Sequence, residues 1–178
     1  MKINEILSTE DRVKLLAEII GDTGPLSVSK VAKKTRLSKG FVSKYLNLLV
    51  SQRVLTKRGT KFFTRDNNNV KSLRLLLMLD TLDERIFNRY KNVDSVGLYG
   101  SSTKGENTND SDVDLWIKVG KEDQEEIGLL SSRLKQRFGD VNLLVLTDEK
   151  IKKLREKDPM FYHSLFFGSI NIHGKNAL

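Results

Sequence analysis

The segment from residue 97 to residue 119 constrains the fold of this chain more than any other. It reads as a strand that ends at Gly100-Ser101, then ten further residues, and then Asp112-x-Asp114 at the start of a second strand. Side chains alternate across a strand, so the two carboxylates point to the same face. Like charges this close repel, and a divalent cation usually offsets that repulsion. A glycine lets the backbone approach a ligand closely, and the serine adds a hydroxyl, so the segment indicates metal-assisted nucleotide chemistry.

Two other phosphate or metal motifs do not fit the same residues. An EF-hand calcium loop beginning at Asp110 needs glycine where Leu115 stands and glutamate where Lys121 stands. A Walker loop needs lysine at the position of Glu106. A plain polar turn is the remaining alternative. The order of strand, Gly-Ser, turn, Asp-x-Asp and strand favours the phosphate-and-metal interpretation.

This segment resembles the nucleotidyltransferase fold of the DNA polymerase beta superfamily. Its Gly-Ser-x10-Asp-x-Asp spacing is most similar to the minimal nucleotidyltransferases, which are often antitoxin-like partners of HEPN proteins. The similarity includes Lys104-Gly105-Glu106 and Ser111, and it extends over about residues 70–174. It implies two Mg²⁺ ions, with ATP or another nucleoside triphosphate as substrate. The implied metal ligands are Asp112 and Asp114, and the implied nucleotide-binding residues are Gly100, Ser101 and Lys104.

The resemblance also implies a third carboxylate on the next strand, which this chain lacks at the matching position. In Val141-Asn142-Leu143-Leu144 that position holds Asn142, a neutral and weaker ligand for a hard cation. Asp140 lies two residues earlier, on the same face if the strand extends that far, and is the candidate stand-in base acting through a water. The predicted catalytic residues are therefore Asp112, Asp114 and Asp140. An active transferase and a degenerate, nucleotide-binding relative both remain open.

Charge divides the chain into two parts. Residues 1–66 carry 14 Lys and Arg against 6 Asp and Glu, whereas the remainder carries 17 of each. A basic part joined to a neutral one indicates that the first binds a polyanion. The chain has no cysteine, and its most apolar run, Leu75–Leu79, is far too short to cross a membrane. With no signal-peptide pattern at the start, we expect a cytoplasmic protein without a membrane partner.

Residues 1–66 predict three helices and a β-hairpin. The expected helices begin at Thr9-Glu10-Asp11, at Ser27 and, after a Ser38 cap, at Lys39. Two short alternating strands follow around a turn expected at Arg58-Gly59. This arrangement resembles the winged helix-turn-helix domains of bacterial and archaeal regulators.

That second resemblance implies DNA binding through the third helix and the hairpin. Base edges would be reached by Ser43, Lys44 and Asn47. Phosphates would be contacted by Lys39, Lys57, Arg58 and Lys61. A solvated helix face and a protein-docking role are the alternatives for the same residues.

The remaining sequence predicts an α+β protein with two domains, 1–66 and 70–178. A long apolar helix is expected from Val70 to about Tyr90, as the first core helix of the second domain and as a possible homodimer seam. Alternating strands and helices then predict a small mixed sheet. The expected elements are strands Ser95–Tyr99, Val113–Val119, Val141–Leu146 and Ser169–His173, and helices Glu122–Phe138 and one starting at Asp158-Pro159.

Taken together, these features predict a metal-dependent nucleotidyltransferase with a DNA-binding winged helix. It would transfer a nucleoside monophosphate, AMP from ATP, to a hydroxyl of a protein partner or of RNA. The short segment 158–178 beyond the minimal fold is too small to form a pocket for a small acceptor. The alternatives are a DNA-binding regulator, or an antitoxin, whose transferase domain senses a nucleotide without transferring it.

Overall fold

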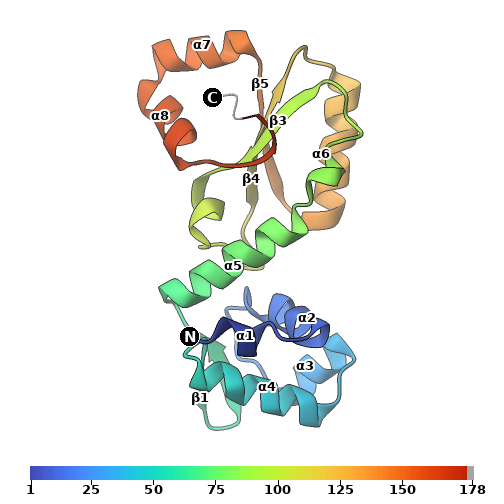
Figure 1. The fold of residues 1–178 in the computed structure, drawn as a ribbon, viewed down its shortest axis with the longest axis vertical. Helices are drawn as coiled ribbons and strands as arrows, with labels where there is room; N and C mark the ends of the chain where they lie inside the picture. Colours follow the sequence, from blue (N-terminus) through green and yellow to red (C-terminus); the bar gives the residue numbers. More distant parts are fainter. Residues whose placement is uncertain (176–178) are drawn as a thin grey trace. The chain divides into compact units, whose positions relative to one another are not determined.

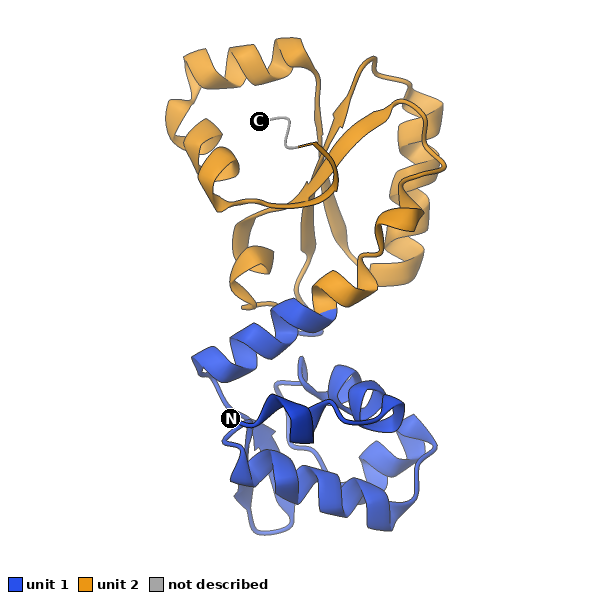
Figure 2. Ribbon diagram, viewed as in Figure 1, with its two compact units in different colours: residues 1–77, 108–110 blue, residues 78–107, 111–178 orange. Residues whose placement is uncertain are grey.

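The structure is a computed structural model that describes residues 1–175. It contains two compact units, shown in different colours in Figure 2. Unit 1 comprises Met1–Leu77 together with Thr108–Asp110, and unit 2 comprises Met78–Asn107 and Ser111–Leu178. Unit 1 holds helices and a β-hairpin, and unit 2 holds a mixed four-stranded sheet with helices, which confirms the predicted α+β class.

Unit 1 begins with four helices whose starts follow local capping signals. The elements are α1 (Ile3–Ile6), α2 (Glu10–Ile19), α3 (Val28–Thr35) and α4 (Lys39–Ser51). The side chains of Thr9, Ser27 and Ser38 each accept a hydrogen bond from the backbone N–H three residues on, so each occupies an N-cap. The three longer helices match the prediction, whereas the one-turn α1 was not predicted.

The hairpin consists of β1 (Leu55–Arg58) and β2 (Lys61–Thr64), paired in antiparallel register. Arg58 pairs with Lys61, so the turn residues are Gly59 and Thr60 rather than the predicted Arg58 and Gly59. The turn falls there because Gly59 adopts a left-handed φ of 57°, which glycine accepts without a steric penalty.

The core of unit 1 lies between its helices and the hairpin. Leu15, Leu46 and Leu49 are fully buried, and Phe62 of β2 exchanges backbone hydrogen bonds with Leu26. Burying one such leucine contributes about 1.5–3 kcal/mol, so these contacts hold α4 and the hairpin in place.

Helix α5 (Asn68–Thr81) is shorter than the predicted helix from Val70 to Tyr90. It ends because the Asp83 carboxylate accepts the backbone N–H of Arg85, which starts the separate 3₁₀ helix η1 (Glu84–Ile86). Val70 and Leu73 at the start of α5 are buried in the core of unit 1. The first part of this helix therefore packs with the N-terminal elements, whereas the prediction made it the first core helix of the second domain.

The sheet of unit 2 has the strand order β5-β4-β3-β6. Its strands are β3 (Val93–Leu98), β4 (Val113–Val119), β5 (Val141–Leu146) and β6 (Ile170–Gly174). β4 and β5 run parallel, and the other pairs are antiparallel. The bounds of β4 and β5 are as predicted, and β6 is an edge strand, as expected.

Helices cover both faces of this sheet (Figure 1): α6 (Gln124–Phe138) lies on one side, and α7 (Asp148–Lys157) and α8 (Pro159–Gly168) lie on the other. Trp116 is fully buried among residues of α7 and α8, and its Nε1 donates to Ser169 Oγ at 2.9 Å. Helix α7 was not predicted, although Thr147 caps its start through the Lys150 N–H. Among residues 1–175, no helix is long and apolar enough to span a membrane.

Candidate functional site

The candidate site lies at one end of the strands of the sheet, where β3 ends and where β4 and β5 begin. The 3₁₀ helix η2 (Gly100–Lys104) follows β3 after one residue, Tyr99, whose backbone N–H donates to the Asp114 carbonyl at 3.0 Å. In the parallel pairing of β4 with β5, Asp114 lies opposite Asn142. This pairing brings the Gly-Ser turn, the aspartate pair and the asparagine to one place.

Asn142 connects the two aspartates. Its Nδ2 donates to Asp112 Oδ2 and to Asp114 Oδ1, each at 3.1 Å. The two carboxylates therefore point to one face, as the alternation predicts, and share a single neutral donor. The amide N–H groups lie between the two carboxylates and partly offset the repulsion between their charges.

Gly100 lies directly against the second aspartate. It has a left-handed φ of 66°, and a Cβ added there would lie only 2.7 Å from Asp114 Oδ2. A side chain at this position would therefore be strained and would also collide with the carboxylate. The close approach places the backbone of the turn beside the acidic pair.

A buried polar network ties the turn to the start of β4. Asn107 Nδ2 donates to Ser102 Oγ at 2.8 Å and to the Asp112 carbonyl at 3.1 Å, and the Asp114 N–H donates to Ser102 Oγ at 3.4 Å. Ser102 and Asn107 are both buried. Sequence reasoning missed these two residues, because a polar residue in a short turn shows no periodicity that separates a buried side chain from a solvated one.

The reactive groups themselves are open to solvent. Ser101, Lys104, Asp112 and Asn142 are exposed, and Asp114 is half-buried. Burial raises the pKa of the neighbouring Tyr99 phenol, and the negative charge of Asp114 raises it further. Tyr99 therefore stays neutral at physiological pH and adds no charge to the site.

The donor set fits one Mg²⁺ ion. Magnesium is commonly held by one or two carboxylates together with water and substrate phosphates, and Asp112 and Asp114 supply two adjacent carboxylates. Within residues 1–175, no group of three or more His, Cys, Asp or Glu side chains is placed to hold a metal. Asp140 is exposed just before β5, so its role as a stand-in base stays a prediction. Within residues 1–175, no third carboxylate therefore stands beside Asp112 and Asp114 to bind a second ion.

The residues predicted to bind DNA all lie in unit 1. Asn47 Nδ2 donates to the Ser43 carbonyl at 2.8 Å, and the half-buried Ser43 faces less solvent than the lysines around it. Within the hairpin, the Lys57 ammonium lies over the Phe62 ring, and the Arg58 guanidinium lies over the Phe63 ring. Six of the predicted residues are exposed: Lys39, Lys44, Asn47, Lys57, Arg58 and Lys61.

A mixed sheet with a Gly-Ser turn against an Asp-x-Asp pair defines a nucleotidyltransferase type of site. The chain belongs to the family described as polymerase beta nucleotidyltransferase, whose model matches residues 84–177, more than half of the chain. Members of this family typically use Mg²⁺ and a nucleoside triphosphate.

Comparisons with curated proteins and with solved structures say less about the family of this chain. No curated protein matches the chain. Among solved structures, the chain is similar to one in a crystal structure of a mutant MntA–HpeT toxin–antitoxin complex, with 18% identity and a TM-score of 0.38. That similarity covers 52% of this chain and 69% of the other. The family assignment depends on the family match and on the geometry of the site.

Proposed function

We propose that this protein is a metal-dependent nucleotidyltransferase that moves AMP from ATP to a hydroxyl of a protein or RNA acceptor. The observation that carries the proposal is the aspartate pair, held side by side by Asn142 and lying against the Gly100 turn. In a chain of the polymerase beta nucleotidyltransferase family, this pair would bring a metal-bound triphosphate to an acceptor hydroxyl.

Asp112 and Asp114 would hold one Mg²⁺ ion that arrives with the triphosphate. Bound Mg²⁺ supplies charge stabilisation for the departing pyrophosphate and orients the triphosphate. Asn142 would turn its Nδ2 away from the pair, or give up one of its two hydrogen bonds, when the carboxylates take up the ion.

The turn would hold the phosphates. Gly100 keeps side-chain atoms away from the approaching triphosphate, and the exposed Ser101 hydroxyl donates to a phosphate oxygen. The exposed Lys104 ammonium neutralises phosphate charge as a point charge. Ser102 and Asn107 lie behind this surface and fix the spacing between the turn and Asp112.

In the transfer itself, the acceptor oxygen forms a bond to the α-phosphorus. The bond from the α-phosphorus to the oxygen that bridges to the β-phosphate breaks, and pyrophosphate leaves with that electron pair. The acceptor proton passes to Asp140 through a water, or directly to solvent. We propose a macromolecular acceptor because Asp112 and Asn142 are exposed, so a protein side chain or an RNA end can reach them.

A labelling experiment tests this proposal. The protein is incubated with Mg²⁺ and ATP labelled at the α-phosphate, together with proteins that co-purify with it and total RNA. The proposal predicts label on a protein or RNA, no label when the γ-phosphate carries it instead, and no transfer by Asp112→Asn/Asp114→Asn. Label from the γ-phosphate would identify a different reaction and contradict the proposal.

Nucleotide sensing without transfer is the second candidate function. The specific observation in its favour is that Asn142 stands where the family carries a third carboxylate, and that its amide occupies one oxygen of each aspartate. On this alternative, Mg²⁺-ATP binds to the wild-type protein and no acceptor is labelled.

We further propose that unit 1 binds DNA as a winged helix, in a regulator or in an antitoxin that represses its own operon. The support is the charge of +8 in residues 1–66 and the exposure of basic residues on α4 and the hairpin. Footprinting on DNA from the protein's own operon at several salt concentrations tests it: a protected site that weakens with salt is expected. A homodimer would protect two half-sites related by symmetry.

A further inference from the structure

Two adjacent pockets in unit 1 are lined by arginines that come from three different segments. One pocket, of about 360 Å³, is lined by residues of β1, β2 and the segment that follows, including Arg58, Arg65 and Asn67. The second, of about 500 Å³, shares Arg65 and Asn67 and adds Arg53, which lies two residues after α4. We name this pair of pockets the arginine groove.

The arginine side chains in the groove have guanidinium groups left to bind a ligand. Within residues 1–175, neither Arg53 nor Arg65 forms an ion pair with a carboxylate, whereas Lys34, Lys118 and Lys150 do. Arg65 Nε donates to the Leu55 carbonyl at 3.2 Å, which orients the side chain and leaves its two Nη groups as a fork. A fixed guanidinium fork matches the geometry of a phosphate group.

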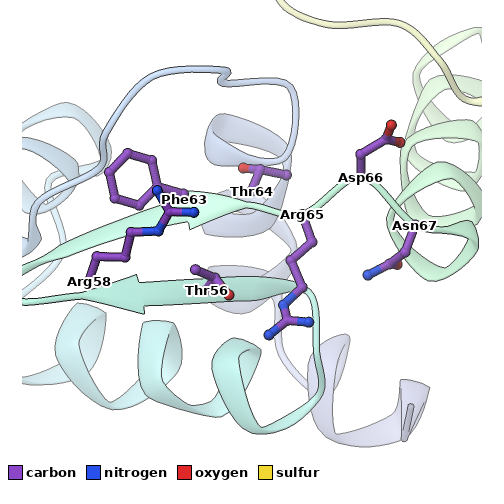
Figure 3. A pocket seen from close by; sticks show the side chains of 7 residues that line it. All are labelled: Thr56, Arg58, Phe63, Thr64, Arg65, Asp66 and Asn67. Atoms are coloured by element: carbon purple, nitrogen blue, oxygen red, sulfur yellow. The ribbon is translucent and has the colours of Figure 1, made fainter.

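The one carboxylate in the groove points away from this fork. Asp66 follows Arg65 directly after β2, and Figure 3 shows their side chains on opposite sides of the chain. The second pocket contains no acidic residue, and its other lining residues are Asn67, Asn68 and Asn69. The groove therefore combines positive charge with neutral hydrogen-bonding groups.

The backbone around Arg53 is also fixed. Arg53 has a φ of 60°, a left-handed conformation that is uncommon for a residue with a Cβ and that usually carries glycine after a helix. Its carbonyl accepts Asn67 Nδ2 at 3.0 Å, and Asn67 Oδ1 accepts the Val70 N–H at 3.1 Å. These bonds connect the end of α4 to the start of α5, so the groove is assembled by tertiary structure.

We propose that the arginine groove binds phosphodiester groups of a DNA backbone, through Arg53 and Arg65. This inference rests on the proposed DNA-binding function of unit 1 and adds a site that lies outside α4 and the hairpin turn. Arg58 joins it only in part, because its guanidinium lies over the Phe63 ring. The groove fixes how the duplex lies on unit 1, and base recognition remains with α4.

Salt-dependent DNA binding by the full chain tests the proposal. Fluorescence anisotropy with a random-sequence duplex gives the dissociation constant at several salt concentrations. The test variant is Arg53→Gln/Arg65→Gln. The matched control is Arg133→Gln/Arg155→Gln, which removes the same charge from exposed positions of unit 2. Because each phosphate contact contributes about 0.9 to the salt slope, the test variant is expected to lower the slope by about 2, and the control by nothing.

A second variant, Arg53→Lys/Arg65→Lys, separates a shaped site from simple charge. It keeps both positive charges, so we expect the salt slope of the wild type with weaker binding, because the fork is lost. DNA binding by the lysine variant as tight as that of the wild type would show that the guanidinium forks are not needed, and would overturn the proposal of a site shaped for phosphate. Circular dichroism confirms that each variant is folded.

The outcomes distinguish this inference from the function on which it rests. If the wild type binds DNA and the glutamine variant has the same salt slope as the unit 2 control, the proposal that the arginine groove binds phosphates is overturned. The proposal that unit 1 binds DNA then still holds. If the wild type binds no duplex at any salt concentration, both are overturned. A slope lowered only in the glutamine variant supports both.

Discussion

Asp112 and Asp114 are each held by neighbours that carry no charge. Asn142 donates to both carboxylates, and Gly100 leaves room for Asp114 Oδ2 where any other residue would collide with it. The site thus keeps two like charges adjacent by means of an amide and a missing Cβ. Three residues of this site can be changed one at a time to test this account.

Asn142→Asp would place a third carboxylate beside the pair. Without metal, the added negative charge should lower the free energy of unfolding, and Mg²⁺ should restore it more than it does for the wild type. If transfer occurs, its rate should rise on the order of tenfold or more, because a second ion gains a charged ligand. Thermal unfolding with and without Mg²⁺ measures the first effect, and the α-phosphate label measures the second.

The matched control is Asn142→Ala, which removes the amide without adding charge. It should lose stability in the absence of metal, because the carboxylates lose their shared donor, but it should not gain the larger response to Mg²⁺. Equal responses of the aspartate and alanine variants would show that position 142 does not reach a metal.

Gly100→Ala tests the close approach of the turn to Asp114. A left-handed alanine costs about 1–2 kcal/mol, and the added Cβ would also displace the Asp114 carboxylate. We expect lower stability together with loss of Mg²⁺-ATP binding, measured by denaturant unfolding and calorimetry. Gly128→Ala in α6 is the control, because nothing lies near its added Cβ and alanine favours a helix. Full nucleotide binding by Gly100→Ala would contradict the assigned role of the turn.

Asn107→Leu tests the buried network behind the turn. It leaves the Asp112 carbonyl without its Asn107 donor and removes the donor to Ser102, which should cost about 1–3 kcal/mol. Because the network sets the spacing between the turn and Asp112, affinity for Mg²⁺-ATP should fall as well. Unchanged affinity, with reduced stability alone, would limit Asn107 to a structural role.

At the scale of elements, capping residues and alternation determined what the sequence could predict. Helix α4 begins at the predicted residue because Ser38 caps it, and strand β4 has the predicted bounds because the apolar alternation defines it. Local chemistry also explains the misses. Asp83 interrupts the long apolar helix, and α7 is mostly charged, with Ile151 and Leu154 packing against the sheet core.

The sequence predicted the turn and the aspartate pair of the candidate site from one local segment, and the family resemblance added the position of Asn142. The Gly-Ser turn and the aspartate pair lie within one segment, so their spacing and the strands on either side indicated them. The contact of Asn142 with both aspartates depends on the β4–β5 register, and the Asn107–Ser102 bond depends on how a turn folds back. Neither leaves a periodic pattern in the sequence.

Ser38→Ala tests the element on which the DNA-binding proposal depends. Loss of an N-cap hydroxyl typically costs about 1 kcal/mol, and replacement by glycine costs only a few tenths. We expect Ser38→Ala to destabilise unit 1 by about that amount and Ser38→Gly to do so less, measured by denaturant unfolding. If both substitutions cost the same, the cap would not be the source of the effect.

At the scale of the whole molecule, two compact units carry two different kinds of candidate site. The basic residues and the arginine groove lie in unit 1, and the aspartate pair lies in unit 2. A ligand that binds only the folded form stabilises it by about 2.7 kcal/mol at roughly 100 times its dissociation constant. In scanning calorimetry, Mg²⁺-ATP should therefore raise the unfolding transition of unit 2, and a DNA duplex that of unit 1. A single ligand that raised both equally would contradict separate sites.

Calorimetric titration of Mg²⁺-ATP into the wild type and into Asp112→Asn/Asp114→Asn tests whether the aspartate pair forms a nucleotide site. We expect a saturable binding heat for the wild type that disappears in the double variant, while circular dichroism shows both to be folded. Removal of Mg²⁺ should abolish the heat as well. Equal heats for the two proteins, or no binding by the wild type, would contradict the assignment of a nucleotide site to the aspartate pair.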